Sequence, residues 1–371
     1  MPLYLTEDQV MLRDTARELM ADEGAIANQL RKYRDMGCKD GFGHALWKQM
    51  AELGFTGILI GESDGGLGLG HVEAGIVLEE IGRNLTPSPF LISAVAVVEA
   101  LKGTPHAQRW FPGILSGDTV AALAVDEGPK HRPEAIAMRA ERAGNGFRLS
   151  GRKQFVVQGA SADVIVVAAC TDEGVTLFAV EKEAKGLEVE GVRLADSSIG
   201  ARLDFRDVEV NADAVVGEVG GGEPVLRRVL DAARAGAASE MVGLGSAAMG
   251  MTVDYLKQRK QFGRLIGEFQ VLQHRAAHLY SELEIARSAA LKAQQLLDEG
   301  SPEAEAMVCV AKAKAGRAST LAVQEGVQMH GGIGMTDEYD IGLYMKRDRA
   351  LNELFGDANY HADKLARMKG Y

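Results

Sequence analysis

The hydrophobic residues of this chain change their spacing twice, and this change limits the possible folds more than any other feature. In the C-terminal part they recur at helical spacing through three long segments, roughly 224–258, 268–298 and 302–329. A Gly-Ser-Pro sequence separates the last two segments, as expected where one helix ends and another begins. Ala and Gly are frequent here, and small residues let helix axes approach closely. We therefore expect residues 223–371 to form a four-helix bundle.

The middle of the chain has the pattern of a β domain. Short apolar runs such as GFRLSG, KQFVVQ and ADVIVVAAC alternate with Gly, Asn and Asp, which is typical of half-buried strands. Upstream the spacing is helical again, broken by the turn-rich sequence GESDGGLGLG. The expected fold is mainly α with a central β domain: an N-terminal all-α domain (1–116), a middle β-barrel or sandwich domain (117–222) and the C-terminal bundle (223–371).

Charge and composition exclude several classes of protein. Lys and Arg total 41 against 52 Asp and Glu, a net charge of −11 without a basic block, so nucleic acid is not the expected partner. The longest weakly charged run, AGAASEMVGLGSAAMGMTV, falls short of the roughly 20 strongly apolar residues of a membrane span, and the acidic N-terminal stretch does not resemble an export signal. Three Cys without a CxxC pair suit reduced thiols. We expect a cytoplasmic protein without a membrane span.

Four local motifs are ambiguous or lack their usual context. Neither GGLGLG (65–70) nor GLGSAAMG (243–250) follows a strand and opens a helix, so a Rossmann phosphate turn is not expected. His274 and His278 are four residues apart but lack the Glu of the HExxH pattern, so we expect no metal site. Gly331–Gly332 follows the helical sequence GVQMH and is, on local grounds, either a helix stop or an exposed backbone for a ligand.

Longer motifs give a resemblance to one family. RKQFGRLIGEFQVLQ (259–273), VQMHGGIGMTDEYDIGLYMKRDRA (327–350) and the earlier SDGGLGLG occur in the positions typical of acyl-CoA dehydrogenases. The chain resembles this family over essentially its whole length, including the order helix, β, helix. The resemblance implies an FAD-dependent enzyme that removes an α proton and a β hydride from an acyl-CoA thioester, gives the 2-enoyl-CoA, and passes electrons to an electron-transfer flavoprotein.

The resemblance also implies site residues. The positions expected to reach the FAD of a neighbouring subunit are Arg259, Gln261, Phe262, Ile266, Phe269, Gln270, Gln328, Gly331 and Gly332. A fixed cation and an open glycine backbone are what a pyrophosphate needs. Asp231 and Arg234 match the family's pair near the acyl-CoA. A cofactor shared between subunits implies an oligomer, which in this family is a tetramer.

The β domain departs from the family. The family has a Thr-Glu-Pro strand and a Gly-Ser-Asp loop beside the flavin and thioester, where this chain has AVDEGPKHRPEAI. Val125 and Asp126 occupy the corresponding positions but do not have the side chains of the family. Phe155 and Val157 replace a Trp and a Thr whose hydroxyl can bond near the flavin. The expected flavin wall keeps an aromatic residue and loses the hydroxyl.

The catalytic base of the family is missing. Alignment from Arg347 and Asp348 places Gly356 on the family's Glu and Asp357 on the Gly that follows it, while a second known place for the base falls on Ala233. Asp357 is one residue away, a step that turns a side chain by about 100° on a helix. It is a candidate base or a helix cap. The backbone N–H of Gly356 is a candidate donor to the thioester carbonyl.

The residues for a neighbour's FAD are retained, whereas this chain's own flavin wall and base are altered. We favour a catalytic subunit of a hetero-oligomeric dehydrogenase whose base comes from a paralogous, Glu-bearing partner, as in bacterial enzymes acting on steroid side-chain or dicarboxylic thioesters. A self-sufficient homo-oligomer that uses Asp357 or another carboxylate as its base is the alternative. In either case the resemblance implies a role in fatty acid or steroid side-chain β-oxidation. A non-catalytic flavin or acyl-CoA binding module is a third possibility, and a DNA-associated flavoprotein is disfavoured by the charge of −11.

Overall fold

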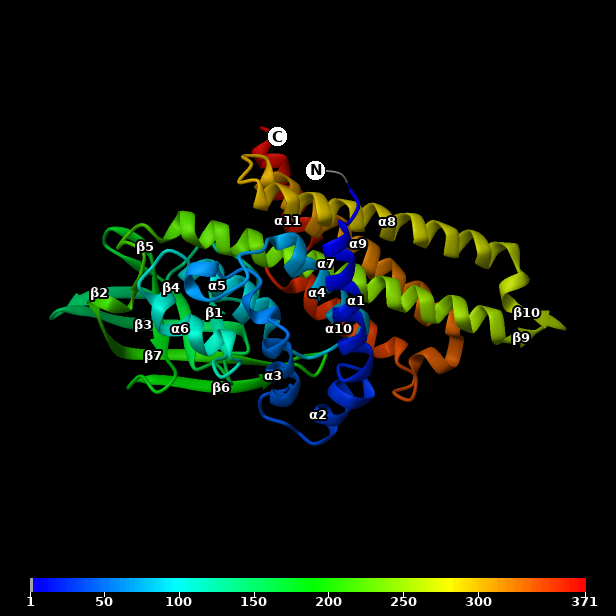
Figure 1. The fold of residues 1–371 in the computed structure, drawn as a ribbon, viewed down its shortest axis with the longest axis horizontal. Helices are drawn as coiled ribbons and strands as arrows, with labels where there is room; N and C mark the ends of the chain where they lie inside the picture. The colour runs from blue at the N-terminus through cyan, green and yellow to red at the C-terminus, as the bar shows by residue number, and fades with distance from the viewer. Residues whose placement is uncertain (1–2) are drawn as a thin grey trace. The chain divides into compact units, whose positions relative to one another are not determined.

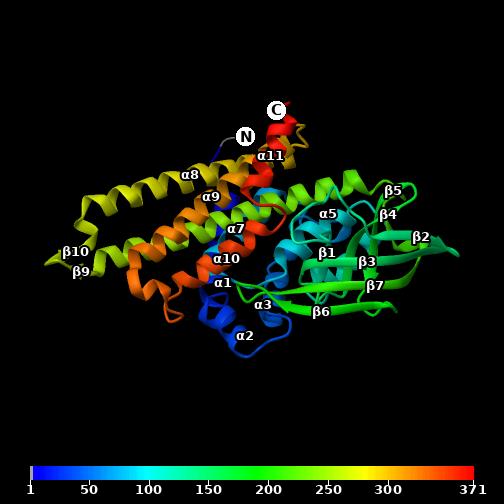
Figure 2. The ribbon, with the colours of Figure 1, turned by 180° about the vertical axis from the view of Figure 1, so that it is seen from behind.

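The computed structural model describes residues 3–371, so the first two residues of the N-terminal stretch lie outside the described residues. Helices, a sheet and further helices follow one another along the chain, from blue through green to red in Figures 1 and 2, which confirms the predicted fold class. The chain divides into two compact units. The first contains the described residues up to Arg31, His71–Thr86 and Arg234–Tyr371, and the second contains Lys32–Gly70 and Pro87–Ala233.

The second unit is built on an eight-stranded sheet. Its strands are β1 (Ala121–Ala124), β2 (Arg139–Ala143), β3 (Gly146–Val157), β4 (Val164–Thr171), β5 (Gly174–Glu181), β6 (Leu187–Arg193), β7 (Ile199–Asn211) and β8 (Val215–Val216). Their order is β6-β7-β3-β2-β4-β5-β8, with β1 paired in parallel to β4. β4, VIVVAACT, is buried along most of its length because β-branched and small residues fill both faces of a central strand. The predicted runs GFRLSG and KQFVVQ form the single strand β3, whose pairing with β7 is irregular between Lys153 and Val156.

Short helices complete the second unit. They are α2 (Lys32–Asp35), α3 (His44–Glu52), α5 (Val98–Leu101), α6 (His106–Leu115) and a π-helical segment, Phe90–Val97. Ser93, in the buried π-helical segment, joins this segment to the sheet. Its hydroxyl donates to the carbonyl of Ala121 in β1 at 2.8 Å and accepts from the Ala121 N–H at 2.9 Å. This pairing satisfies the edge of β1, which leads directly to Val125.

The first unit is helical. Its helices are α1 (Glu7–Asp22), α4 (His71–Asn84), α8 (Gln270–Asp298), α9 (Ala304–His330), α10 (Ile341–Glu353), α11 (Ala358–Met368) and the larger part of α7 (Gly222–Gln258), which begins in the second unit. α7, α8 and α9 correspond to the three long segments predicted from the sequence. Their core is rich in Ala, and α1 and α4 pack in the same unit. Each compact unit therefore combines segments that are far apart in the sequence, whereas the predicted domains are consecutive stretches of the chain.

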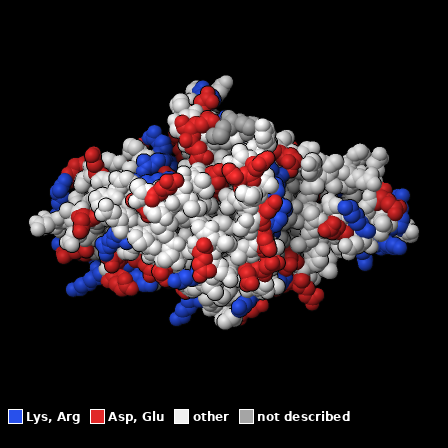
Figure 3. Space-filling model, in the orientation of Figure 1, with Lys and Arg blue, Asp and Glu red and all other residues white. Residues whose placement is uncertain are grey.

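The surface carries both signs of charge. Figure 3 shows acidic and basic side chains interspersed on the visible face without a continuous basic stripe, in keeping with the net charge of −11. Among residues 3–371, no helix has both the length and the apolar character that a membrane crossing requires. Within the same residues, no group of three or more His, Cys, Asp or Glu is arranged to hold a metal ion.

Gly243→Ala should destabilise the first unit. A methyl group at Gly243 of α7 would overlap the backbone carbonyl of Glu79 in α4, so one helix would have to move. We expect the free energy of unfolding, measured by urea denaturation, to fall by about 1–3 kcal/mol. Gly250→Ala is the matched control, because Gly250 is exposed on the same helix and an added Cβ meets no atom within 4 Å. The control should gain about 0.5–1 kcal/mol from helix propensity, and equal effects would contradict the close approach of α4 and α7.

Candidate functional site

The residues predicted to contact a neighbour's cofactor come together at one end of the helical unit. Arg259 follows α7 and leads into a hairpin of β9 (Lys260–Gln261) and β10 (Arg264–Leu265). Its carbonyl accepts from the Ile266 N–H at 2.9 Å, which closes the hairpin. Ile266 packs in one apolar cluster with Met329, near the end of α9. This cluster places the hairpin beside the helix end from which the Gly-Gly turn follows.

Most of these predicted residues are accessible to a ligand. Phe262 is 89% exposed, although its φ of +52° is unfavourable for a residue other than glycine. Within residues 3–371, the exposed Arg259 guanidinium forms no ion pair. Gly331 and Gly332 expose their backbone, since an added Cβ would meet no atom within 4 Å. An accessible guanidinium beside an open glycine backbone fits the pyrophosphate of FAD. The remaining predicted contacts, exposed or half-buried, are Gln261, Phe269, Gln270 and Gln328.

A buried histidine that sequence reasoning missed fixes the turn at this end of α9. His330 contacts the Gly326 carbonyl through Nδ1 at 2.7 Å and the Tyr339 hydroxyl through Nε2 at 3.2 Å. Because the carbonyl can only accept, Nδ1 carries the proton and Nε2 accepts from the hydroxyl. Burial lowers the pKa of His330, which favours this neutral form. Its only sequence signal is its place directly before the two glycines.

The position of the family's base lies in the connection between α10 and α11, which is held by three basic side chains. Phe355 has a φ of +58° and Gly356 a φ of +101°. The Phe355 carbonyl accepts from Arg234 Nε and from His361 Nε2, both at 3.1 Å. The Gly356 carbonyl accepts from Lys312 Nζ at 3.1 Å. Both carbonyls therefore point toward buried donors rather than toward solvent.

Lys312 is the second functional candidate that sequence reasoning missed. It is 1% exposed on α9, and its ammonium also donates to the carbonyls of Leu351 (2.9 Å) and Asn352 (3.4 Å) at the end of α10. Burial, and after it the Arg234 charge, lower the pKa of Lys312 to about 7, although carboxylates including Asp348 oppose the shift. Hydrogen bonds from Lys312 Nζ thus connect α9 to the end of α10 and to the connection that follows it.

The Arg-Asp pair used to align the connection has internal partners. Arg347 donates to Glu240 from Nε at 2.9 Å and from Nη2 at 2.6 Å. Asp348 accepts from the hydroxyls of Ser319 at 2.5 Å and Thr320 at 2.9 Å. Burial raises the pKa of Asp348, and the two hydroxyls oppose that change. The pair anchors α10 to α7 and α9.

Gly356 and Asp357 are both engaged in local structure. The Gly356 N–H donates to the Glu353 carbonyl at 3.3 Å, and a Cβ on Gly356 would overlap the Tyr360 ring. Asp357 is the N-cap of α11, with Oδ1 accepting from the N–H groups of Asn359 (3.0 Å) and Tyr360 (2.8 Å). A side chain at position 356 would therefore need a different backbone and a displaced Tyr360.

The predicted substrate-side pair lies on α7 and is buried. Asp231 is 5% exposed and belongs to the second unit, whereas Arg234 is 1% exposed and belongs to the first. Besides its bond to the Phe355 carbonyl, the Arg234 guanidinium lies 5.6 Å from the centre of the Tyr360 ring. Ala233, the alternative base position, is fully buried.

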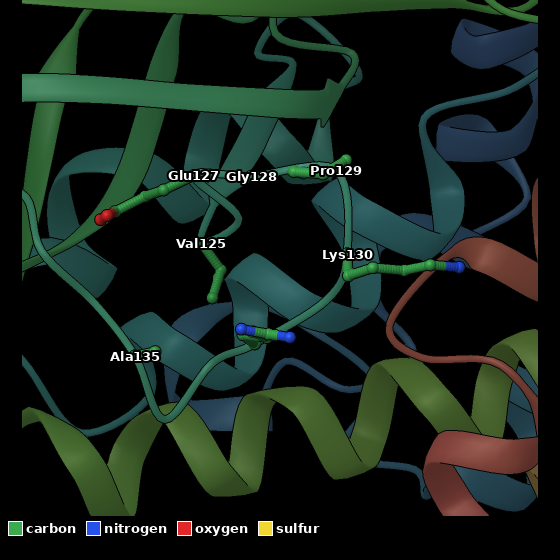
Figure 4. A pocket seen from close by; sticks show the side chains of 7 residues that line it. Val125, Glu127, Gly128, Pro129, Lys130 and Ala135 are labelled. Carbon is green, nitrogen blue, oxygen red and sulfur yellow. The ribbon is translucent and has the colours of Figure 1, made fainter.

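The predicted flavin wall lies in the second unit. Phe155 is 52% exposed with a φ of +54°, at the irregularity of β3, and Val157 is half-buried. Asp126 contacts His131 Nδ1 at 2.9 Å. Val125 lines an open cavity of about 400 Å³, shown in Figure 4. The other lining residues are Glu127, Gly128, Pro129, Lys130, Arg132 and Ala135.

Comparison with known proteins agrees with this architecture. Models of the N-terminal and C-terminal domains of acyl-CoA dehydrogenases match residues 6–118 and 220–369. The mitochondrial isovaleryl-CoA dehydrogenase of Solanum tuberosum is 33% identical over 83% of this chain and 78% of its own length. The ChsE4–ChsE5 complex of Mycobacterium tuberculosis superposes with a TM-score of 0.92 at 25% identity over the whole of both chains. A Tcur3481–Tcur3483 steroid ACAD variant gives 0.90 at 28% identity over 98% of both chains.

The chain belongs to the acyl-CoA dehydrogenase family. It is an oxidoreductase of this family with FAD as its cofactor. The family, the enzyme class and the cofactor predicted from the sequence are thereby confirmed.

The stability of the protein should depend on the protonation of Lys312. Between its folded pKa of about 7 and its unfolded pKa of 10.5, the unfolded chain binds one more proton than the native chain. The free energy of unfolding of the wild type, minus that of Lys312→Met, should therefore rise as the pH is raised above 7. The slope should be at most about 1.4 kcal/mol per pH unit, and the difference should become constant below about pH 6. Urea denaturation across this range measures the difference.

Lys314→Met is the control for this experiment. Lys314 is on the same helix but lies partly exposed in an ion pair with Glu282 at 2.5 Å, so this variant also removes one positive charge. A relative stability that falls as pH rises, or a rise that Lys314→Met reproduces, would contradict the assignment of the pH effect to the buried Lys312.

Proposed function

We propose that this chain is a subunit of a hetero-oligomeric acyl-CoA dehydrogenase and that the catalytic base comes from a paralogous, Glu-bearing partner subunit. The observation that carries the proposal is the geometry of Gly356, whose positive φ and contact with Tyr360 leave no room for a side chain at the family's base position. Ala233, the second base position, has no carboxylate either. The similarity to two complexes named as pairs of proteins supports such a pairing.

The proposed reaction is the α,β-dehydrogenation of an acyl-CoA thioester, with electrons passed to an electron-transfer flavoprotein. When bound, FAD would supply the acceptor for the hydride that leaves the β carbon. Arg259 and the Gly331–Gly332 backbone hold the pyrophosphate of a neighbour's FAD, while Gln261, Phe262, Ile266, Phe269, Gln270 and Gln328 complete that contact. Val125, Asp126, Phe155 and Val157 line this chain's own side of the cofactor. The proposed enzyme is a cytoplasmic tetramer with domains at 1–116, 117–222 and 223–371.

The substrate-side residues act mainly by positioning in this proposal. Arg234 holds the Phe355 carbonyl, and through it the connection that faces the thioester. Asp231 lies on the same helix and accompanies Arg234 on the acyl-CoA side. The N–H of Gly356 reaches a thioester carbonyl only if its 3.3 Å bond to the Glu353 carbonyl opens. The acyl group belongs to the steroid side-chain class in the preferred version, as the steroid relative suggests.

Asp357 serves as a helix cap rather than as a base in this proposal. Its Oδ1 accepts two backbone N–H groups at the start of α11, where the helix dipole also favours a carboxylate. The competing hypothesis is a self-sufficient homo-oligomer in which Asp357 abstracts the α proton. The two hypotheses differ in what removal of this single carboxylate does to the chemical step.

Asp357→Asn should leave flavin reduction nearly intact. In the assembled complex, the rate of acyl-CoA-dependent flavin bleaching in stopped flow should stay within about tenfold of wild type, because no proton transfer depends on Asp357. Asn caps a helix about as well as Asp, so α11 should also be retained. Asp357→Ala should lower the free energy of unfolding by about 0.5–2 kcal/mol, because the helix cap is lost. Its rate of flavin bleaching should also stay close to that of wild type. A fall of roughly 10²–10⁴ in both variants, with FAD content and assembly intact, would establish Asp357 as the base instead.

Arg259→Ala should weaken FAD retention by the assembled oligomer. Loss of a charge-assisted contact to phosphate typically costs about 1.5–3 kcal/mol, or roughly tenfold to hundredfold in affinity. FAD release during dilution, followed by flavin fluorescence, measures the effect. Lys257→Ala is the control, because it removes an exposed positive charge two residues earlier. Equal FAD retention in the two variants would rule out the proposed contact.

A further inference from the structure

A second cavity lies in the helical unit, where α4 packs against α1 and α8 (Figure 1). Its volume is about 330 Å³, and its lining comes from α1, α4, α7 and α8 together with Leu3–Leu5 near the start of the chain. None of the lining residues belongs to the sites described above for FAD and the acyl-CoA thioester. The cavity is therefore a separate feature that the proposed dehydrogenation does not use.

One wall of this cavity is a network of ion pairs. The Glu80 carboxylate is fully buried and accepts from Arg17 at 2.8 Å and from Arg83 at 3.1 Å. Glu79 accepts from Arg287 Nη2 at 3.0 Å. A buried carboxylate needs such partners, so these guanidinium groups are already fixed in place when a ligand arrives. Donors that are fixed beforehand lose little conformational entropy on binding.

Two arginines of α1 bring further N–H donors to the cavity. Arg13 and Arg17 both line it and are four residues apart, a spacing that places side chains on one face of a helix. Arg13 is half-buried, and its Nε (3.0 Å) and Nη2 (2.8 Å) donate to the exposed Asp14. Arg17 is exposed, and only its Nη2 has a hydrogen-bond acceptor among the described residues, namely Glu80. Because a guanidinium has five N–H donors, both side chains can donate to a ligand as well.

The charges that line the cavity do not cancel. Four arginines and three glutamates line it, and each glutamate contacts one of these arginines. Arg13 differs from the other three arginines, because its partner Asp14 does not line the cavity. The lining thus has one positive charge more than it has negative charges, although the whole chain has a net charge of −11. Its apolar side includes Val72, Ile76, Val242 and Leu291.

We propose that this cavity binds a small organic carboxylate and that Arg13 and Arg17 hold the carboxylate group. One excess positive charge suits a monoanion, and the planar fork of a guanidinium matches the two oxygens of a carboxylate. The apolar side of the cavity suits a hydrocarbon body. The volume of about 330 Å³ lies at the lower end of the range for small-molecule sites, roughly 300–1,000 Å³. The inference does not depend on the origin of the catalytic base.

The first test compares a carboxylate with its neutral counterpart. The probes are 3-phenylpropanoate and 3-phenylpropanamide, which differ only in the charged group, and titration calorimetry measures their binding to the assembled protein. The carboxylate should bind at least about tenfold more tightly than the amide, because only the carboxylate forms charge-assisted hydrogen bonds with the arginines. Saturating CoA should leave this binding unchanged. The proposal is overturned if the carboxylate does not bind, if the amide binds equally well, or if CoA displaces the probe.

The second test changes the two arginines. Arg13→Gln should weaken binding of 3-phenylpropanoate at least about tenfold, and it should not affect folding, because its ion pair with Asp14 is local and partly exposed. Arg17→Lys keeps a charge beside Glu80 but removes the planar fork, so it should weaken binding by a smaller factor. Arg367→Gln is the control, because Arg367 forms a similar local ion pair with Asp363 outside the cavity. A loss in either cavity variant beyond that of the control supports the site, and equal affinity in all three variants overturns it.

Discussion

A buried ammonium group determines the geometry of the segment around which the candidate site is built. Lys312 has three N–H donors, and they meet three backbone carbonyls at the end of α10 and in the connection to α11. A buried amino group without such partners would be costly in either protonation state, so the connection is held where its carbonyl meets Nζ. Phe355 has an unfavourable φ in this connection, and its carbonyl accepts from Arg234 and His361. The shape of the connection thus depends on the buried donors Lys312, Arg234 and His361 rather than on Asp357 at the start of α11.

The two candidate regions of the helical unit differ in how fully their polar groups are satisfied. Around Gly356, each carbonyl and the capping carboxylate has a partner within the chain. At the hairpin beside α9, by contrast, Phe262 and Arg259 are exposed and two glycines present open backbone. Groups left available in one chain are the ones that a second chain or its cofactor can use. This difference agrees with a subunit that completes its neighbour's FAD site while its own base position is closed.

The sequence predicted the parts of the fold that have a long, regular pattern. α7, α8 and α9 were predicted because helical spacing continues through many turns, and β4 because apolar residues fill a short run between turns. The absence of a Glu at position 356 was visible because the family motif fixes the alignment. Lys312 and His330 were not predicted, since one lysine or histidine in a helix gives no indication of which carbonyl it meets; Leu351, a partner of Lys312, is 39 residues away. The packing of α1 and α4 with the C-terminal helices is likewise a tertiary feature that spacing alone does not encode.

The surroundings of Gly356 also limit what a single substitution at this position can achieve. A mutation that placed Glu at this codon would meet a backbone conformation that side chains rarely adopt and a space already filled by Tyr360. A carboxylate at position 356 therefore requires a second change, one that moves the Tyr360 ring out of this space. A single Gly356→Glu substitution would therefore disturb the packing of the connection against α11 before it could present a carboxylate to a substrate.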